Sequence, residues 1–174
     1  MAPATAEEAI PDLLDELEVL FQAHHRAVFG TAFRITGNAA DAEDVLQTVF
    51  LRLAGRGPGA PPLENSASYL RRAAINAALD VLRARRAEDS VPIDESQPDP
   101  SQPEPGDLRE LLRRALAKLS PEAAEIFALR FFEGHSNREV ARLLGMSQVR
   151  VAVALHRARR RLQKEISLYL GGKS

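Results

Sequence analysis

The sequence has no cysteine and no tryptophan, and only 5% of its 174 residues are aromatic. The lack of cysteine excludes disulfides and thiolate metal sites, and it fits a reducing compartment. No apolar run approaches the roughly 18 residues of a membrane span, and the acidic N-terminus (MAPATAEEAIPDLLDELE) is unlike a secretory signal. The period-two alternation of half-buried strands is also missing. We therefore expect a soluble, cytoplasmic, all-α protein.

The net charge of −1 conceals an asymmetry along the chain. Residues 1–100 hold nine basic and 16 acidic residues, whereas residues 101–174 hold 14 basic and eight acidic ones. The basic half favours a nucleic-acid partner, although two solvated helical surfaces of opposite charge would give the same balance.

An acidic, proline-rich segment divides the chain. Residues 88–107 contain seven acids, five of the eleven prolines and no Lys or Arg. Such a segment cannot bury much apolar area, and each proline removes a backbone donor. We predict a flexible linker over 88–106, between two small helical domains at 1–87 and 107–174.

Apolar spacing predicts three helices in the N-terminal domain. The first follows Pro11 and ends at Gly37, and the second covers about 39–54. After a loop rich in Gly and Pro over 55–65, the third helix begins at a Ser66 or Ser68 cap and continues to about residue 87.

The C-terminal domain contains a helix-turn-helix pattern. A helix over 107–119 and a second one that begins at Ser120-Pro121 precede it. The pattern itself covers 137–156, with helices expected from Ser136 to Leu144 and from Ser147 to about Tyr169. Ala141 is small at the expected helix crossing, Gly145 suits a turn of positive φ, and Ser147 can cap the second helix.

Basic residues accumulate on this pattern, with eight of them and one acid between residues 138 and 164. Basic side chains that neutralise phosphates release counterions, which contributes strongly to DNA affinity. The pattern and the charge together predict DNA binding. A helical hairpin with a solvated basic face, or one that binds RNA or an acidic protein, is the alternative.

Three segments, in this order, resemble the extracytoplasmic-function sigma factors of bacterial RNA polymerase. They are TGNAADAEDVLQTVFLRL (36–53), SYLRRAAINAALDVLRARR (68–86) and LSPEAAEIFALRFFEGHSNREVARLLGMSQVRVAVALHRARRRL (119–162). The resemblance implies an alternative sigma factor with a region 2-like and a region 4-like domain. Its partners would be the β and β′ subunits of core polymerase, promoter DNA and, as is common in the family, an anti-sigma factor.

The resemblance also implies roles for individual residues. The helix over 39–54 would dock on the clamp helices of β′, through Asp41, Asp44, Gln47, Phe50 and Leu51. The segment 55–87 would read and melt the −10 element, through Tyr69, Arg71, Arg72, Asn76 and Arg83. The helix-turn-helix would sit on the β flap and read the −35 element, through Ser147, Gln148, Arg150, Arg157 and Arg161.

Two features depart from the family pattern. The loop at 55–65 is rich in Gly and Pro where the family has a short polar stretch. The −10 specificity of the family therefore cannot be assigned to this loop. Ala152 and Ala154 replace the polar or basic residues common in the recognition helix, which leaves Arg150 and Arg157 as the candidates for base contacts. Tyr69, where the family often has Trp, is either a stacking platform for bases or a core aromatic.

An enzyme is disfavoured, because the chain has four histidines, no HExxH and no phosphate-binding glycine loop. We expect no cofactor and no metal site, since the adjacent His24 and His25 point about 100° apart on a helix. A stand-alone helix-turn-helix regulator is the other alternative, and it would leave the motifs at 36–53 and 68–86 without a role.

Overall fold

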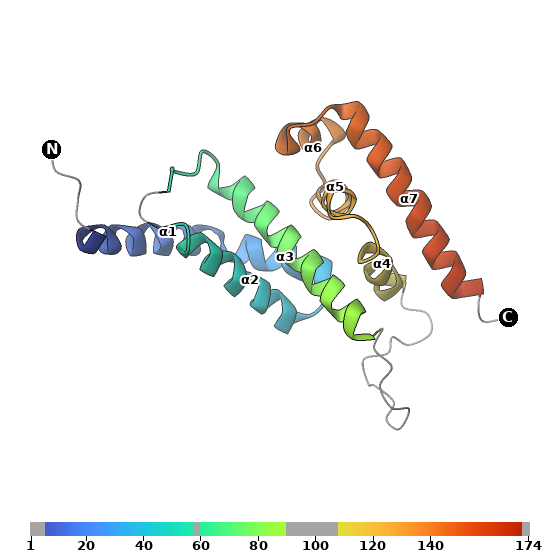
Figure 1. Cartoon of the computed structure of the whole chain (residues 1–174), viewed down its shortest axis with the longest axis horizontal. Coiled ribbons are helices and arrows are strands. Elements are labelled where there is room, and N and C mark those ends of the chain that lie inside the picture. The colour runs from blue at the N-terminus through green and yellow to red at the C-terminus, as the bar shows by residue number, and fades with distance from the viewer. Residues whose placement is uncertain (1–5, 58–59, 90–107, 172–174) are drawn as a thin grey trace, which may run out of the picture. The chain divides into compact units, whose positions relative to one another are not determined.

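The computed structural model describes residues 6–57, 60–89 and 108–171, which form seven helices and no strand (Figure 1). The predicted all-α class is therefore confirmed. The chain divides into two compact units, Met1–Ala78 and Leu79–Ser174. Helix α3 (Ser66–Asp89) contributes to both units, and it includes the first two residues of the predicted linker. The other linker residues lie outside the described part of the chain.

The first unit packs α1 (Ala6–Thr36) against α2 (Ala39–Ala54), and these two helices lie side by side in Figure 1. Its core consists of side chains that are at most 1% exposed: Val28, Ala32 and Ile35 from α1, Ala42, Val45 and Val49 from α2, and Leu70, Ala74 and Ile75 from α3. The hydroxyl of Ser66 also lies 3.2 Å from Nε2 of His24, which links α1 to the beginning of α3.

The start expected for α1 is wrong, and so is the residue expected to cap α3, although α3 does begin at Ser66. Helix α1 begins at Ala6 instead of after Pro11, because the fixed φ of proline is compatible with a helix; the cost is one missing hydrogen bond and crowding against the carbonyl four residues earlier. Helix α3 is capped by Asn65 instead of by a serine, since the Asn65 side chain accepts from the Ser68 backbone N–H over 2.9 Å. Asparagine is among the strongest N-cap residues, because its short side chain reaches the first free N–H groups.

The junction of α1 and α2 follows the expected turn chemistry. Gly37 adopts a φ of 69° directly after α1, where a side chain would be strained. Asn38 then caps α2 by accepting from the Asp41 backbone N–H over 3.1 Å. The sharp change of direction brings α2 back along α1.

The second unit contains α4 (Leu108–Leu116), α5 (Pro121–Phe131), α6 (Asn137–Leu144) and α7 (Gln148–Gly171). The long α7 packs against each of the other three helices (Figure 1). Helix α4 ends three residues before the predicted Leu119, because the chain tightens there into i to i+3 hydrogen bonds at Lys118 and Leu119. Ser120 caps α5 with Pro121 in its first turn, as the sequence predicts.

The core of this unit lies along one side of α7. Val151, Leu155, Ala158 and Leu162 are at most 4% exposed, and they meet fully buried residues of the neighbouring helices, among them Leu116, Ile126, Leu129 and Val140. Within the described residues, no helix is both long enough and apolar enough to cross a membrane.

Candidate polymerase and DNA interfaces

One flank of α2 is open to solvent. Asp44, Gln47 and Leu51 are exposed, and their spacing of three and four residues places them on the same side of the helix. Leu51 is 71% exposed, so this flank offers an accessible apolar side chain beside its polar ones. Asp41 is partly buried in the first turn, where its charge suits the positive end of the helix dipole. The flank thus combines an acid, an amide and an apolar group.

Phe50 lies on the buried side of α2, next to the open flank and three residues from Gln47. It is only 7% exposed, and its ring packs edge-on against Phe21 of α1 with 4.9 Å between the ring centroids. The structure therefore separates Phe50 from Asp44, Gln47 and Leu51, with which the sequence had grouped it. Its contribution to this face is to hold α2 against α1.

The first turn of α3 presents an aromatic ring with a cation above it. Tyr69 is 38% exposed, so it is not the core aromatic that was one of the two expectations. The Arg56 guanidinium lies 5.6 Å from the centre of the Tyr69 ring and also donates to the Pro61 carbonyl over 2.7 Å. Arg56 therefore joins the loop after α2 to the start of α3, a contact that no local sequence pattern predicts.

The remaining predicted −10 residues follow along α3. Arg71, Arg72 and Asn76 are all partly buried, and Arg83 pairs with Asp80 one turn before it over 3.0 Å. Leu79 follows Arg72 and Asn76 at helical spacing, which predicts that it shares their side of the helix, but it is 1% exposed. The buried side of α3 is therefore wide: Ile75, Ala78, Leu79 and Leu82 are all buried, whereas Ala84 is exposed.

Helix α6, the first helix of the helix-turn-helix, begins with a capping box. The Ser136 hydroxyl accepts from the Glu139 backbone N–H, and the Glu139 carboxylate accepts in return from the Ser136 backbone N–H over 2.7 Å. The Ser136 hydroxyl also donates to the Glu139 carboxylate over 2.7 Å. The two hydrogen bonds that the carboxylate accepts, the one from the Ser136 backbone first and the one from its hydroxyl second, hold the pKa of Glu139 below its ordinary value of 4.5. The S-x-x-E pattern of Ser136 and Glu139 is the sequence signal for this box, and it was not among the predicted features.

The turn between the two helices has the geometry that its sequence predicts. Gly145 is left-handed with φ 63° and ψ 35°, and the Met146 N–H reaches back to the Ala141 carbonyl over 2.9 Å. Ser147 then accepts from the Arg150 backbone N–H over 3.2 Å, which caps α7. Val140 and Ala141 are buried, at 0% and 6% exposure, on the side of α6 that packs against α7.

The outer surface of α7 carries the predicted −35 residues. Gln148, Arg150, Arg157 and Arg161 are all exposed, as is Ser147 just before the helix. Arg150 donates to the Glu122 carboxylate of α5 over 2.8 Å. The structure therefore brings Arg150 to the side of α7 that faces the start of α5, and it exposes Arg157 and Arg161 further along the helix.

Aromatic residues and arginines meet beside this helix. Phe131, 42% exposed at the end of α5, has the Arg159 guanidinium 5.0 Å from its ring centre and Arg130 at 5.5 Å. Such cation–π contacts fix the direction of the guanidinium groups. Arg159 is thereby oriented towards α5.

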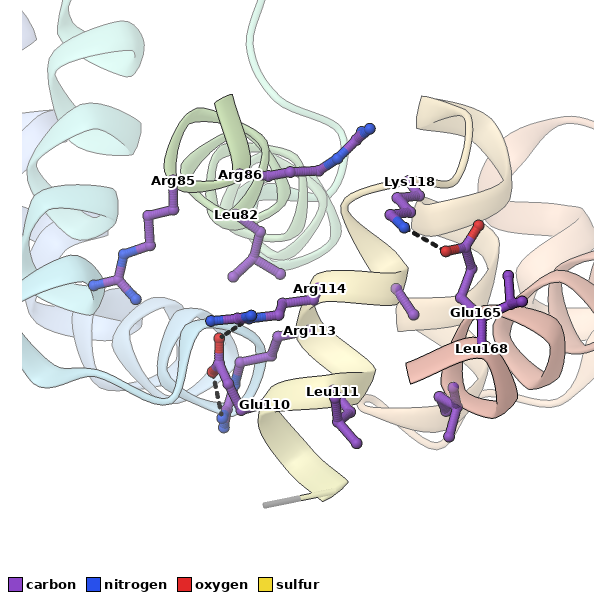
Figure 2. Close-up of a pocket in the computed structure, with 12 residues that line it drawn as sticks. Leu82, Arg85, Arg86, Glu110, Leu111, Arg113, Arg114, Lys118, Glu165 and Leu168 are labelled. Atoms are coloured by element: carbon purple, nitrogen blue, oxygen red, sulfur yellow. Dashed lines mark hydrogen bonds and ion pairs between the residues drawn. The ribbon is translucent and has the colours of Figure 1, made fainter. Parts of the chain in front are cut away.

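A cavity of about 550 Å³ lies within the second unit, and all of its lining residues belong to that unit (Figure 2). Arg113 and Arg114 pair with Glu110 at its wall over 3.6 and 3.5 Å, and Lys118 pairs with Glu165. The hydrogen bond from Lys118 lowers the pKa of Glu165. Because the basic side chains named here already have carboxylate partners, we read the cavity as part of the scaffold that supports α7.

The histidines do not assemble a metal site. His25 donates through Nδ1 to the Phe21 carbonyl over 2.8 Å, and His24 contacts Ser66 instead. Among the residues that the structure describes, no group of three His, Asp or Glu side chains is placed to hold a metal ion.

Two family models match the chain in the order that these surfaces follow. Sigma-70 region 2 matches residues 20–88, and sigma-70 region 4 matches residues 109–162. The RNA polymerase sigma-E factor of Streptomyces avermitilis is 36% identical over 154 residues, which is 87% of this chain and 85% of the relative. The ECF RNA polymerase sigma factor SigM of Mycobacterium tuberculosis is 31% identical over 146 residues, 83% and 74% of the two chains.

Among solved structures, the sigma factor RpoE of Bartonella quintana, in complex with the anti-sigma factor NepR, is 24% identical with a TM-score of 0.47. The alignment covers 90% of this chain and 98% of that one. From the family models and the curated relatives, the chain belongs to the sigma-70 family of bacterial RNA polymerase sigma factors, in its extracytoplasmic-function group. It is therefore a transcription initiation factor, the subunit that directs core RNA polymerase to specific promoters.

Proposed function

We propose that three described surfaces divide the work of this sigma factor. The exposed flank of α2 docks on the clamp helices of the β′ subunit, the start of α3 engages the −10 element, and α7 reads the −35 element. The observation that carries this proposal is the outward face of α7. Between residues 148 and 164 the helix carries six basic side chains and no acid, and Arg157, Arg160 and Lys164 lie exposed on the side away from its buried stripe.

Docking through α2 rests on the chemistry of its open flank. Asp44 and Gln47 offer a charge and an amide that remain accessible, and Leu51 adds an apolar contact beside them. Protein interfaces combine apolar contacts with hydrogen-bonding groups, and this flank offers both kinds of group side by side. Phe50 supports this flank from the core side, and Asp41 anchors the first turn.

Engagement of the −10 element rests on Tyr69 and its neighbours. Promoter melting requires no catalytic group, because a site that binds unstacked bases more tightly than the duplex offsets the cost of unpairing. The accessible Tyr69 ring offers a stacking surface, Asn76 can bond a base edge, and Arg71, Arg72 and Arg83 can contact phosphates. We accordingly assign the chain no catalytic activity of its own, and we place it in the cytoplasm with the polymerase.

Run-off transcription with core polymerase on a library of genomic promoter fragments tests the proposal. We expect transcripts from a defined subset of promoters only when both core enzyme and the factor are present. A stand-alone regulator would instead bind the same duplexes equally well with and without core enzyme and would start no transcript. That result would reject the proposal, and it would leave the region 2 match over residues 20–88 without a function.

A further inference from the structure

Two valines occupy the outward face at the start of α7. Val149 is 73% exposed and Val153 is 43% exposed, and their spacing of four residues places them next to each other on the helix surface. Each is two residues from the fully buried Val151, which corresponds to a rotation of about 160° around the helix axis. They therefore lie close to the line directly opposite the core.

The surroundings of this valine pair are strongly basic. No acid occurs between residues 148 and 164, and Arg157 and Arg160 are exposed about one and two turns further along the same outward side. The charge favours a polyanion as the occupant of this face. The occupant must also offer apolar groups to the valines, since a purely phosphate surface would leave them without a partner.

The major groove of DNA offers an apolar group of this kind. Thymine projects its 5-methyl group there, and apolar side chains at the start of a recognition helix contact it. We propose that Val149 and Val153 read thymine in the −35 element through its 5-methyl group. This inference rests on the proposed placement of α7 in the −35 major groove.

The spacing of the two valines makes the proposal more specific. At 1.5 Å per residue they are separated by about 6 Å along the helix axis. Stacked base pairs are about 3.4 Å apart, so the two methyl groups belong to thymines about two base steps apart, on either strand. Arg150, held beside α5 by Glu122, lies on a flank of the helix and is not part of this contact.

Replacement of thymine by deoxyuracil removes the methyl group and leaves every hydrogen-bonding atom in place. Full-length protein with core polymerase is therefore compared on two promoters that differ only by uracil at the thymines of the −35 element. We expect uracil to weaken binding by about three- to fivefold for each contacted methyl group, the scale of burying one methyl. In Val149→Ala and Val153→Ala the ratio of the two affinities falls towards one.

Leu168→Ala provides the matched control. Leu168 is 62% exposed on the same helix, about 22 Å from Val153 along the axis, so its removal leaves the thymine-to-uracil ratio unchanged. Circular dichroism confirms that each variant keeps its helices.

Two outcomes overturn the inference in different ways. If the wild-type protein prefers its −35 sequence to a scrambled one but binds the uracil promoter equally well, the valines do not read thymine, while the −35 role of α7 stands. If it shows no preference for the −35 sequence at all, the proposed function of α7 fails together with the inference. A loss of core-enzyme binding in Val149→Ala with an unchanged thymine-to-uracil ratio would instead assign the valine face to a protein contact.

Discussion

The guanidinium of Arg150 donates to the carboxylate of Glu122 over 2.8 Å, which joins the first turn of α7 to the first turn of α5. Both side chains are largely accessible, at 61% and 49% exposure. An ion pair of this exposure contributes only about 0–1 kcal/mol to stability. We expect its larger effect on DNA binding, because Glu122 engages the Nη2 group of Arg150 and places a negative charge beside a proposed DNA contact.

Glu122→Gln is therefore expected to raise the affinity of the free factor for a −35 duplex. Loss of the carboxylate removes both a competitor for Arg150 and a negative charge close to the DNA. The gain should be largest at low salt, where screening is weakest, and should shrink in an Arg150→Ala background. Fluorescence anisotropy over a salt series measures it, with Glu16→Gln as a control of equal charge change on α1. Equal gains in DNA affinity in the wild-type and Arg150→Ala proteins would show that Glu122 does not compete with DNA for Arg150.

The α2 flank is tested by the double substitution of Asp44 and Gln47 to Ala. Association with core polymerase should weaken, while stability should change by less than about 0.5 kcal/mol because both positions are exposed. A pull-down with purified core enzyme measures the first effect, and thermal unfolding measures the second. Glu43→Ala, an exposed acid next to Asp44 but off the flank, serves as the control. Unchanged core binding in the double variant would remove this flank from the interface.

Asn76→Ala is expected to reduce open-complex formation more than closed-complex binding. The amide is proposed to bond a base edge that becomes available only after the strands separate. Permanganate footprinting of unpaired thymines reports melting, and a mobility-shift assay reports binding to the duplex. Glu88→Ala, exposed near the end of α3, is the control. Equal losses in both assays, or none in either, would reject a role of Asn76 in melting.

The helix-turn-helix was the most predictable part of the molecule. Its boundaries depend on local signals, such as the Ser147 cap and the left-handed Gly145, and these act within a few residues of the chain. Helical periodicity likewise places Val151 and Leu155 on one face, and that face is buried.

Contacts between distant residues were not predictable in this way. The burial of Phe50 depends on Phe21 in another helix, and the orientation of Arg150 depends on Glu122, 28 residues away. Periodicity also misjudged α3, because it assumes one buried face whereas Leu79 and Leu82 are buried as well as Leu70 and Ala74. The predicted start of α1 was wrong for a different reason. Pro11 was taken to precede the helix, whereas the helix begins at Ala6 and includes it.

The capping box of α6 makes the stability of the second unit depend on pH. The folded pKa of Glu139 lies below its ordinary value, so the ionised carboxylate stabilises the fold at pH values above the unfolded pKa. This contribution should be lost as the pH falls below about 4.5 and through the lowered folded pKa. Urea unfolding of the full chain between pH 7 and pH 3 measures it. Glu139→Gln keeps a side-chain acceptor but does not titrate, so its midpoint should fall less; a parallel fall in both proteins would refute the assignment.

The final prediction separates base reading from charge attraction along α7. Arg150 lies in the first turn of the helix, which enters the major groove in helix-turn-helix proteins, whereas Arg161 lies about 16 Å further along the axis. Arg150→Ala should therefore cost about 1–3 kcal/mol on the preferred −35 sequence and little on scrambled DNA. Arg161→Ala should weaken both complexes alike and flatten the salt dependence by about one unit, as expected for the loss of one phosphate contact. Binding of both variants to matched and scrambled duplexes across a salt series distinguishes the two roles. If Arg150→Ala lowers both affinities equally, Arg150 contacts only the backbone, and direct reading by α7 is left to its outward face, where Val149 and Val153 lie.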